Sequence, residues 1–259
     1  MSKKYNIYAT LFDSFEFMVG NEDFNHEDII DRINRVETAD QKAIRRMELG
    51  TALNDLIDVF LTGSDLWGDM LDAWEKQCED AEFNGKKATS EDGKPVRRLY
   101  PIYNKKEYLI GNIDVKTLKQ LLTLFEDSVS QLRVETTIKT DFGDVCIYGY
   151  MDYAKEDVGF DLKTTSNYDL NKYYKAFQKD IYGLCLFDSG STITEFKYVI
   201  VTYSMNTMDV ATFKDIAIES FPFNYETSLQ KVKLQAVEII KFIEKYKEKI
   251  TDKKIFNIE

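Results

Sequence analysis

The spacing of apolar residues divides the sequence into zones with different expected structures. From about residue 24 to residue 80, apolar side chains recur at three- and four-residue steps, which is typical of amphipathic helices. We expect two or three helices there. Residues 83–108 contain two glycines and two prolines, which interrupt regular structure and predict a long loop or a small hairpin.

Beyond this stretch the pattern becomes mainly that of β-strands. After a helix expected over 114–129, β-type runs predict strands. The full order is strands over 132–140, 144–153 and 158–165, a helix over 169–188, strands over 194–204 and 208–220, and a helix over 225–249. This order predicts an α/β fold, in which a central mixed β-sheet is flanked by helices and preceded by a helical N-terminal region.

We find no internal repeat and no linker at which to divide the chain, so one domain over 1–259 is expected. Its expected parts are a mainly helical part over 1–82, a basic insertion over 83–108, an α/β core over 130–215 and a C-terminal helix over 225–250.

Composition excludes several classes of protein. A hydrophobic content of 44% and an aromatic content of 14% are typical of a globular chain rather than a disordered one. No segment approaches the roughly 20 apolar residues that span a bilayer, and the first residues lack the continuous apolar core of a signal peptide. We therefore expect a soluble protein in the cytoplasm, with no membrane partner.

Cysteine and histidine are too scarce for two common kinds of site. Cys78, Cys146 and Cys185 are odd in number and far apart, which favours buried thiols over disulfides or a Cys-x-x-Cys metal site. With His26 as the single histidine, the sequence disfavours a zinc site and a Ser-His-Asp triad.

Two acids and a lysine are expected at neighbouring positions in the core. Asp161 and Lys163 share one face of their strand because side chains two apart in a strand point the same way. A hairpin around 154–157 would bring Asp152 close to Asp161. Two carboxylates at one place repel each other unless a cation lies between them, and oxygen ligands suit Mg²⁺ or Mn²⁺. The alternative is a surface ion pair between Asp161 and Lys163.

The sequence segments around these residues resemble the motifs of a nuclease family. "YGYMDY", "GFDLKTT" and "KAFQKDIYGL" resemble, in order and spacing, the Gly-x-x-Asp, Asp-x-Lys-Thr and Gln-x-x-x-Tyr motifs of the PD-(D/E)XK superfamily, in its RecB-like and lambda-exonuclease-like branch. The resemblance implies a restriction-endonuclease-like core. It also implies that Asp152, Asp161 and the main-chain carbonyl of Leu162 bind the metal and that Lys163 is the catalytic lysine.

The same resemblance assigns further residues to the site. Gln178 and Tyr182, four apart on the following helix, would face the same cleft. "RRMELGTALNDLID" resembles the Gly-x-x-x-His helix of RecB-like nucleases, with Gly50 matching and Asn54 in the place of the histidine. An amide is a poor substitute for imidazole as a ligand, so metal affinity or choice would differ. Glu135 occupies the place of the acid on the first core strand, where it would bind metal through water or turn toward the Gly50 helix.

The net charge of −11 is unusual for a protein that holds DNA. Two groups of basic residues are candidates for the contact with phosphate. They are Lys86, Lys87, Lys94, Arg97, Arg98, Lys105 and Lys106, which are interleaved with Tyr100, Tyr103 and Tyr108, and then Lys172, Lys175 and Lys179 on the helix expected over 169–188. A solvated polar loop is an equally good interpretation of the first group.

Three functions follow from these observations. The first is a DNA nuclease dependent on Mg²⁺ or Mn²⁺, exonucleolytic, acting in recombination, repair or phage replication, in a bacterial or phage-infected cell. Its partners would be DNA and a single-strand-annealing or replication protein. The second is an inactive nuclease-fold subunit for binding or assembly, and the third is an acidic DNA mimic. The intact trio of Asp152, Asp161 and Lys163 favours the first. The oligomeric state stays open.

Overall fold

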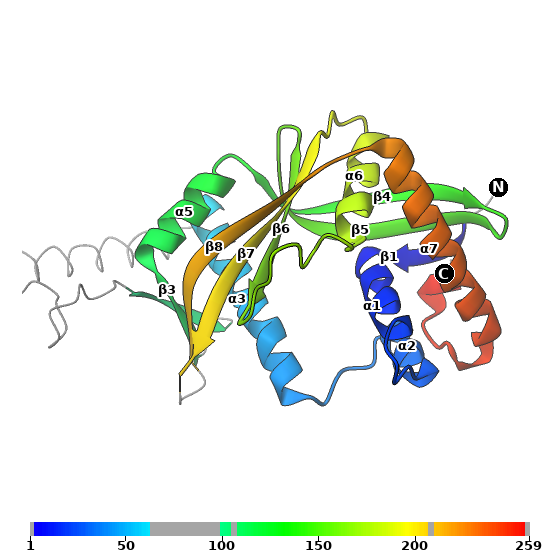
Figure 1. The fold of residues 1–259 in the computed structure, drawn as a ribbon, viewed down its shortest axis with the longest axis horizontal. Helices are drawn as coiled ribbons and strands as arrows, with labels where there is room; N and C mark the ends of the chain where they lie inside the picture. The colour runs from blue at the N-terminus through cyan, green and yellow to red at the C-terminus, as the bar shows by residue number, and fades with distance from the viewer. Residues whose placement is uncertain (1–2, 63–98, 105–107, 207–209, 257–259) are drawn as a thin grey trace, which may run out of the picture.

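A twisted mixed β-sheet runs through the molecule, with helices on both of its faces (Figure 1). The computed structural model describes residues 3–62, 99–104, 108–206 and 210–256. The strands are β1 Lys3–Tyr8, β2 Leu99–Asn104, β3 Tyr108–Asp114, β4 Val129–Thr140, β5 Gly143–Lys155, β6 Val158–Thr165, β7 Glu195–Met205 and β8 Ala211–Pro222. The helices are α1 Ala9–Val19, α2 His26–Ile33, α3 Gln41–Thr62, α5 Val115–Phe125, α6 Gln178–Asp188 and α7 Tyr225–Lys245, followed by two short 3₁₀ turns.

The order of strands in the sheet is β1-β5-β6-β7-β8-β3-β2, and β4 pairs with β5 as well. The pairs β1/β5, β6/β7 and β3/β8 are parallel, whereas the other neighbours are antiparallel. Strand β6 therefore lies in the interior of the sheet, between β5 and β7.

Each face of the sheet is covered by its own set of helices. One hydrophobic cluster joins the sheet to α1, α2, α6 and α7, and a second joins it to α3 and α5. Successive side chains of β7 point alternately into the two clusters. Tyr198 and Ile200 belong to the first, and Val199 and Val201 belong to the second. The sheet is thus buried on both sides along β7.

Most of the expected elements are confirmed. The chain is α/β with a mixed central sheet, and the strand expected over 158–165 has those bounds. The hairpin between β5 and β6 is present. Helices α2 and α3 account for the helical zone as far as residue 62, and the part from 63 to 98 lies outside the described residues. The end of the expected insertion forms the β2/β3 hairpin.

One expectation about an element is wrong, and one strand was not anticipated. Strand β1 precedes the helices of the N-terminal part and pairs in parallel with β5. The helix expected over 169–188 begins only at Gln178. Residues 170–175 form successive turns, and Asn171 has a φ of 66°, in the left-handed region that a right-handed helix excludes.

Other expectations concern cysteine, histidine and the membrane. Cys146 and Cys185 are both buried, as expected, and Cys78 lies outside the described residues. The ring of His26 stacks on Tyr246, with centroids 5.1 Å apart. Within the described ranges, no helix is both long enough and apolar enough to cross a membrane.

Gly149 allows helix α6 to approach strand β5 closely. A Cβ atom at Gly149 would lie 2.8 Å from Cε1 of Tyr182 and 3.1 Å from the Cβ of Ala9. Tyr182 is only 1% exposed, so its ring has little room to move away. The close packing of Tyr182 of α6 against this position therefore explains why the "GYMD" segment begins with a glycine.

We predict that Gly149→Ala lowers the free energy of unfolding by about 1–3 kcal/mol, because overpacking forces the surrounding core to shift. Gly50→Ala is the control, since its new Cβ would meet only the Thr164 hydroxyl, at 3.5 Å. Alanine inside helix α3 should be neutral or stabilising. Thermal unfolding of both variants checks this. Similar unfolding midpoints for the two would contradict the steric explanation.

Candidate metal and phosphodiester site

The site begins where strands β5 and β6 separate. Their antiparallel pairing runs from Lys155–Val158 to Tyr153–Phe160. Two residues beyond Phe160 on β6, the N–H of Leu162 donates to Oδ2 of Asp152, at 2.7 Å. The side chain of Asp152 thus replaces a main-chain acceptor at this fork, which holds its carboxylate between the two strands.

Lys163 links strand β6 to helix α6. Phe160 and Leu162 belong to the cluster under α3 and α5, so alternation turns Asp161 and Lys163 toward the opposite face. There the Lys163 ammonium lies 2.5 Å from Oδ2 of Asp161 and donates to Oε1 of Gln178 at 2.9 Å. Asp161, Lys163 and Gln178, which the resemblance nominated, are therefore in direct contact.

A chain of hydrogen bonds continues from Gln178 back to the sheet. The side-chain amide of Gln178 donates to the Tyr182 hydroxyl at 3.3 Å, and this hydroxyl donates to the carbonyl of Tyr150 at 3.0 Å. Gln178 and Tyr182 are both buried. Their i, i+4 spacing on α6 thus fixes the orientation of the amide that receives Lys163.

Asp13 of helix α1 was not identified from the sequence. Its Oδ1 accepts the N–H of Phe177 at 2.5 Å, and it also accepts the main-chain N–H of Gln178. Phe177 is the N-cap of α6 and supplies no side-chain cap of its own. Asp13 therefore caps α6 from another helix and places a negative charge where the helix dipole favours one. Its position, 164 residues away from Phe177, left no local signal.

The charges at the site shift each other's protonation. Burial, and then the nearby charge of Asp161, raises the pKa of Asp152 to about 7, although the Leu162 N–H and Lys163 oppose the shift. Burial alone would lower the pKa of Lys163, but the Asp161 carboxylate outweighs it and the pKa is raised. Burial also raises the pKa of Asp13. Lys163 is thus kept protonated, while Asp152 and Asp161 resist carrying two negative charges together.

Asn54 and Glu135 lie apart from these contacts. Asn54 accepts a hydrogen bond from the Tyr153 hydroxyl at 3.2 Å, and Tyr153 belongs to the cluster under α3, on the face away from Lys163. Glu135 is exposed and forms an ion pair with Arg133 at 2.9 Å. Its register partner precedes Asp152 by four residues, a distance of about 13 Å along a strand.

Two carboxylates and a carbonyl fit a hard divalent cation. Oδ2 of Asp161 is buried, and the Lys163 ammonium is the neighbour that compensates its charge, at 2.5 Å. Oxygen ligands and mutual repulsion with Asp152 suit Mg²⁺ or Mn²⁺, which keep several waters in their coordination shell. In the part of the chain that the structure describes, no three acidic, histidine or cysteine side chains gather as a metal cluster, so the remaining ligands would be the Leu162 carbonyl and water.

The structure gives little support to the first group of residues expected to contact DNA. Lys86, Lys87, Lys94, Arg97, Arg98, Lys105 and Lys106 all lie outside the described residues. Tyr100 is 1% exposed and packs against Phe60, so it is not free to stack on a base.

The second group of lysines does not form one helix face, because α6 starts at Gln178. Lys172 donates to the Thr165 hydroxyl and the Asn167 carbonyl, each at 3.1 Å. Lys179 is largely buried beside Asp180, and burial lowers its pKa to about 8. Lys172 and Lys175 are both exposed on this turn segment.

Comparison with known proteins adds little to this geometry. No protein-family model matches the chain, and no curated protein matches it. One similar solved structure, described as the crystal structure of SSO0001, is 14% identical and has a TM-score of 0.33. The match covers 47% of this chain and 55% of that one, so it spans about half of that protein's length. A similarity this weak carries no argument about fold or function.

We predict a pH-dependent stability difference for Asp152→Asn in metal-free protein. Because the folded protein raises the pKa of this carboxyl from 3.8 to about 7, it binds more protons than the unfolded chain between these values. Stability contributed by the protonated carboxyl is therefore lost as pH rises through about 7. Asparagine keeps an acceptor for the Leu162 N–H without the charge.

In chelator, the Asp152→Asn variant should unfold at a higher temperature than the parent protein at pH 8, by roughly 2–4 °C for each kcal/mol regained. The difference should shrink toward pH 4. Calorimetric scans across this range provide the measurement. The assignment would be contradicted if the difference in unfolding temperature between variant and parent were less favourable to the variant at pH 8 than at pH 4.

Proposed function

We propose that this protein is a divalent-metal-dependent deoxyribonuclease with a PD-(D/E)XK, restriction-endonuclease-like core. The observation that carries the proposal is the position of Lys163, held by Asp161 and Gln178 beside the fork where Asp152 lies. A surface ion pair would not need a buried amide as a second partner, whereas a lysine that acts on a substrate must be held in one orientation.

The residues of the site have distinct roles in this proposal. Asp152, Asp161 and the carbonyl of Leu162 would hold Mg²⁺ or Mn²⁺. When bound, the cation supplies Lewis-acid polarisation of the phosphodiester and lowers the pKa of a coordinated water. Lys163 stays protonated because Asp161 raises its pKa. It therefore acts as a hydrogen-bond donor and not as a base, orienting the attacking water and stabilising the negative charge that develops on phosphate.

Gln178 and Tyr182 serve as positioning residues in the proposed reaction. The Gln178 amide accepts from Lys163 and donates to Tyr182, so its rotamer is fixed at both ends. This limits the positions that the ammonium can take. Preorganised donors of this kind avoid the reorganisation that would otherwise raise the barrier.

The expected biological setting is part of the proposal. A nuclease of this kind would act exonucleolytically in recombination, repair or phage replication, with DNA as substrate and a single-strand-annealing or replication protein as partner. Comparing cleavage of linear and circular DNA distinguishes an exonuclease from an endonuclease, because circular DNA has no end for an exonuclease to use.

A second candidate is an inactive nuclease-fold subunit that binds or assembles. It is favoured by the position of Asn54, which contacts Tyr153 and lies apart from Asp161 and Lys163. This candidate predicts DNA or protein binding without turnover in either metal.

We predict that the protein degrades linear DNA in Mg²⁺ or Mn²⁺ and that Lys163→Ala lowers the rate by at least about 100-fold, since one preorganised donor contributes on this scale. The measurement is release of end label over time, with chelator as the blank.

Lys197→Ala provides a matched control for folding and charge. Lys197 lies on the adjacent strand β7, pairs with Glu195 at 2.8 Å and is 27% exposed, against 26% for Lys163. The control should cleave as the parent does. Cleavage that persists in chelator, or that survives in Lys163→Ala, would refute the proposal, and folded protein without cleavage in any metal would favour the inactive subunit.

A further inference from the structure

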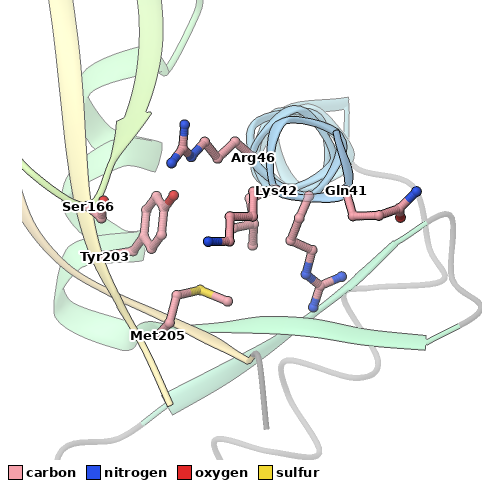
Figure 2. Close-up of a pocket in the computed structure, with 8 residues that line it drawn as sticks. Gln41, Lys42, Arg46, Ser166, Tyr203 and Met205 are labelled. Carbon is pink, nitrogen blue, oxygen red and sulfur yellow. The ribbon is translucent and has the colours of Figure 1, made fainter. Parts of the chain in front are cut away.

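A second candidate site lies beside helix α3, on the face of the sheet opposite to Lys163. A pocket of about 570 Å³ opens between α3 and the ends of β6 and β7 (Figure 2). Its lining includes Lys42, Arg45, Arg46, Ser166, Tyr203 and Met205. This volume is within the range of about 300–1,000 Å³ that is typical of small-ligand sites.

The pocket is basic, although the chain as a whole carries a net charge of −11. Figure 2 shows Lys42 and Arg46 reaching from α3 toward the strand side of the pocket. They are four apart on the helix, so their side chains emerge next to each other. Among the described residues neither side chain has a hydrogen bond or an acidic partner, whereas Arg45 pairs with Glu48 at 3.6 Å and donates to the Ile110 carbonyl at 3.3 Å.

The opposite wall is apolar. Tyr203 and Met205 come from the end of β7, and Leu49 adds an apolar side chain from α3. Met205 is 40% exposed, which is high for so large an apolar side chain in a concave surface. A pocket with two uncompensated cations at one wall and apolar atoms at the other is suited to a ligand that carries a phosphate and a flat apolar ring.

The pocket lies close to the proposed catalytic site along β6, but on the other face of the sheet. Ser166, at its rim, follows Lys163 by three residues at the end of β6, about 10 Å at the rise of a strand. On α3, Gly50 faces Thr164 of the same strand, and Arg46 and Lys42 lie on successive turns toward the pocket. A nucleic-acid strand with one phosphate at Lys163 would therefore pass the end of β6 to place another of its nucleotides here.

We infer that this pocket binds one unpaired nucleotide of a nucleic-acid strand, with its phosphate on Lys42 and Arg46 and its base against the exposed Met205, next to the largely buried Tyr203. This inference rests on the proposed function for its substrate class. A base stacked in a duplex is not available to enter a pocket, whereas the bases of a single strand are, and apolar or aromatic walls accept any base. The site therefore favours single-stranded over fully paired DNA.

The test is binding of a fluorescein-labelled oligothymidylate, followed by anisotropy in chelator so that no cleavage occurs. The double variant Lys42→Gln/Arg46→Gln should bind at least about tenfold more weakly. The slope of log affinity against log salt should become shallower by about 0.7 for each phosphate that the variant no longer neutralises. Met205→Glu, which adds a negative charge to the wall and leaves α3 intact, should weaken binding as well.

Lys241→Gln/Lys245→Gln is the matched control, because it removes two exposed lysines with the same spacing from helix α7. It should bind as the parent does. Parent-like affinity and salt slope in the pocket variants would overturn the inference, as would an equal loss of affinity in the control. Displacement of the oligonucleotide by an equal concentration of thymidine monophosphate would identify a free-nucleotide site instead, and equal binding of a paired duplex of the same length would exclude the unpaired base.

The pocket inference and the nuclease proposal can be refuted independently. If the parent protein cleaves DNA in Mg²⁺ while the pocket variants bind normally, the nuclease proposal stands and the pocket inference is wrong. If the pocket variants lose binding while the parent cleaves nothing, the pocket inference stands and the nuclease proposal is wrong.

Discussion

The contact of one ammonium group with two oxygen atoms determines how the proposed site is built. Lys163 joins Asp161 on its own strand to Gln178 on helix α6, and Lys163 is only about a quarter exposed. A buried carboxylate without this cation would be costly, and a buried ammonium without the carboxylate equally so. The sheet and α6 must therefore keep a fixed distance, and other features of the fold, including the cap from Asp13 and the glycine opposite Tyr182, maintain that distance.

The fork between β5 and β6 adds a second constraint. Asp152 takes the place of a main-chain acceptor for Leu162. Burial, and then the charge of Asp161, raises its pKa, so ionising both carboxyls is unfavourable without a counter-charge. Lys163 supplies part of that charge, and the proposed cation would supply the rest. The pocket at the end of β6 gathers Lys42, Arg45 and Arg46, which gives this acidic chain a locally basic surface.

Local patterns predicted the elements well, and long-range contacts explain where they did not. The strand over 158–165 was predictable because its alternation and flanking turns are local. Strand β1 was not, because it is stabilised by pairing with β5 far along the chain. The start of α6 depends on a cap from Asp13, and the orientation of Asn54 depends on Tyr153, 99 residues away. The motif spacing brought Asp161, Lys163, Gln178 and Tyr182 into one group, but it also included Glu135, which the fold keeps exposed on β4.

The central claim is that Asp152 and Asp161 form a divalent-cation site beside Lys163. Binding of Mn²⁺ to the DNA-free protein, followed by electron paramagnetic resonance of the free ion, tests it most directly. The account predicts saturable binding that is lost in Asp161→Asn and retained in Glu135→Gln, which removes an equal charge from the exposed face of β4. Unchanged Mn²⁺ binding in Asp161→Asn would contradict it.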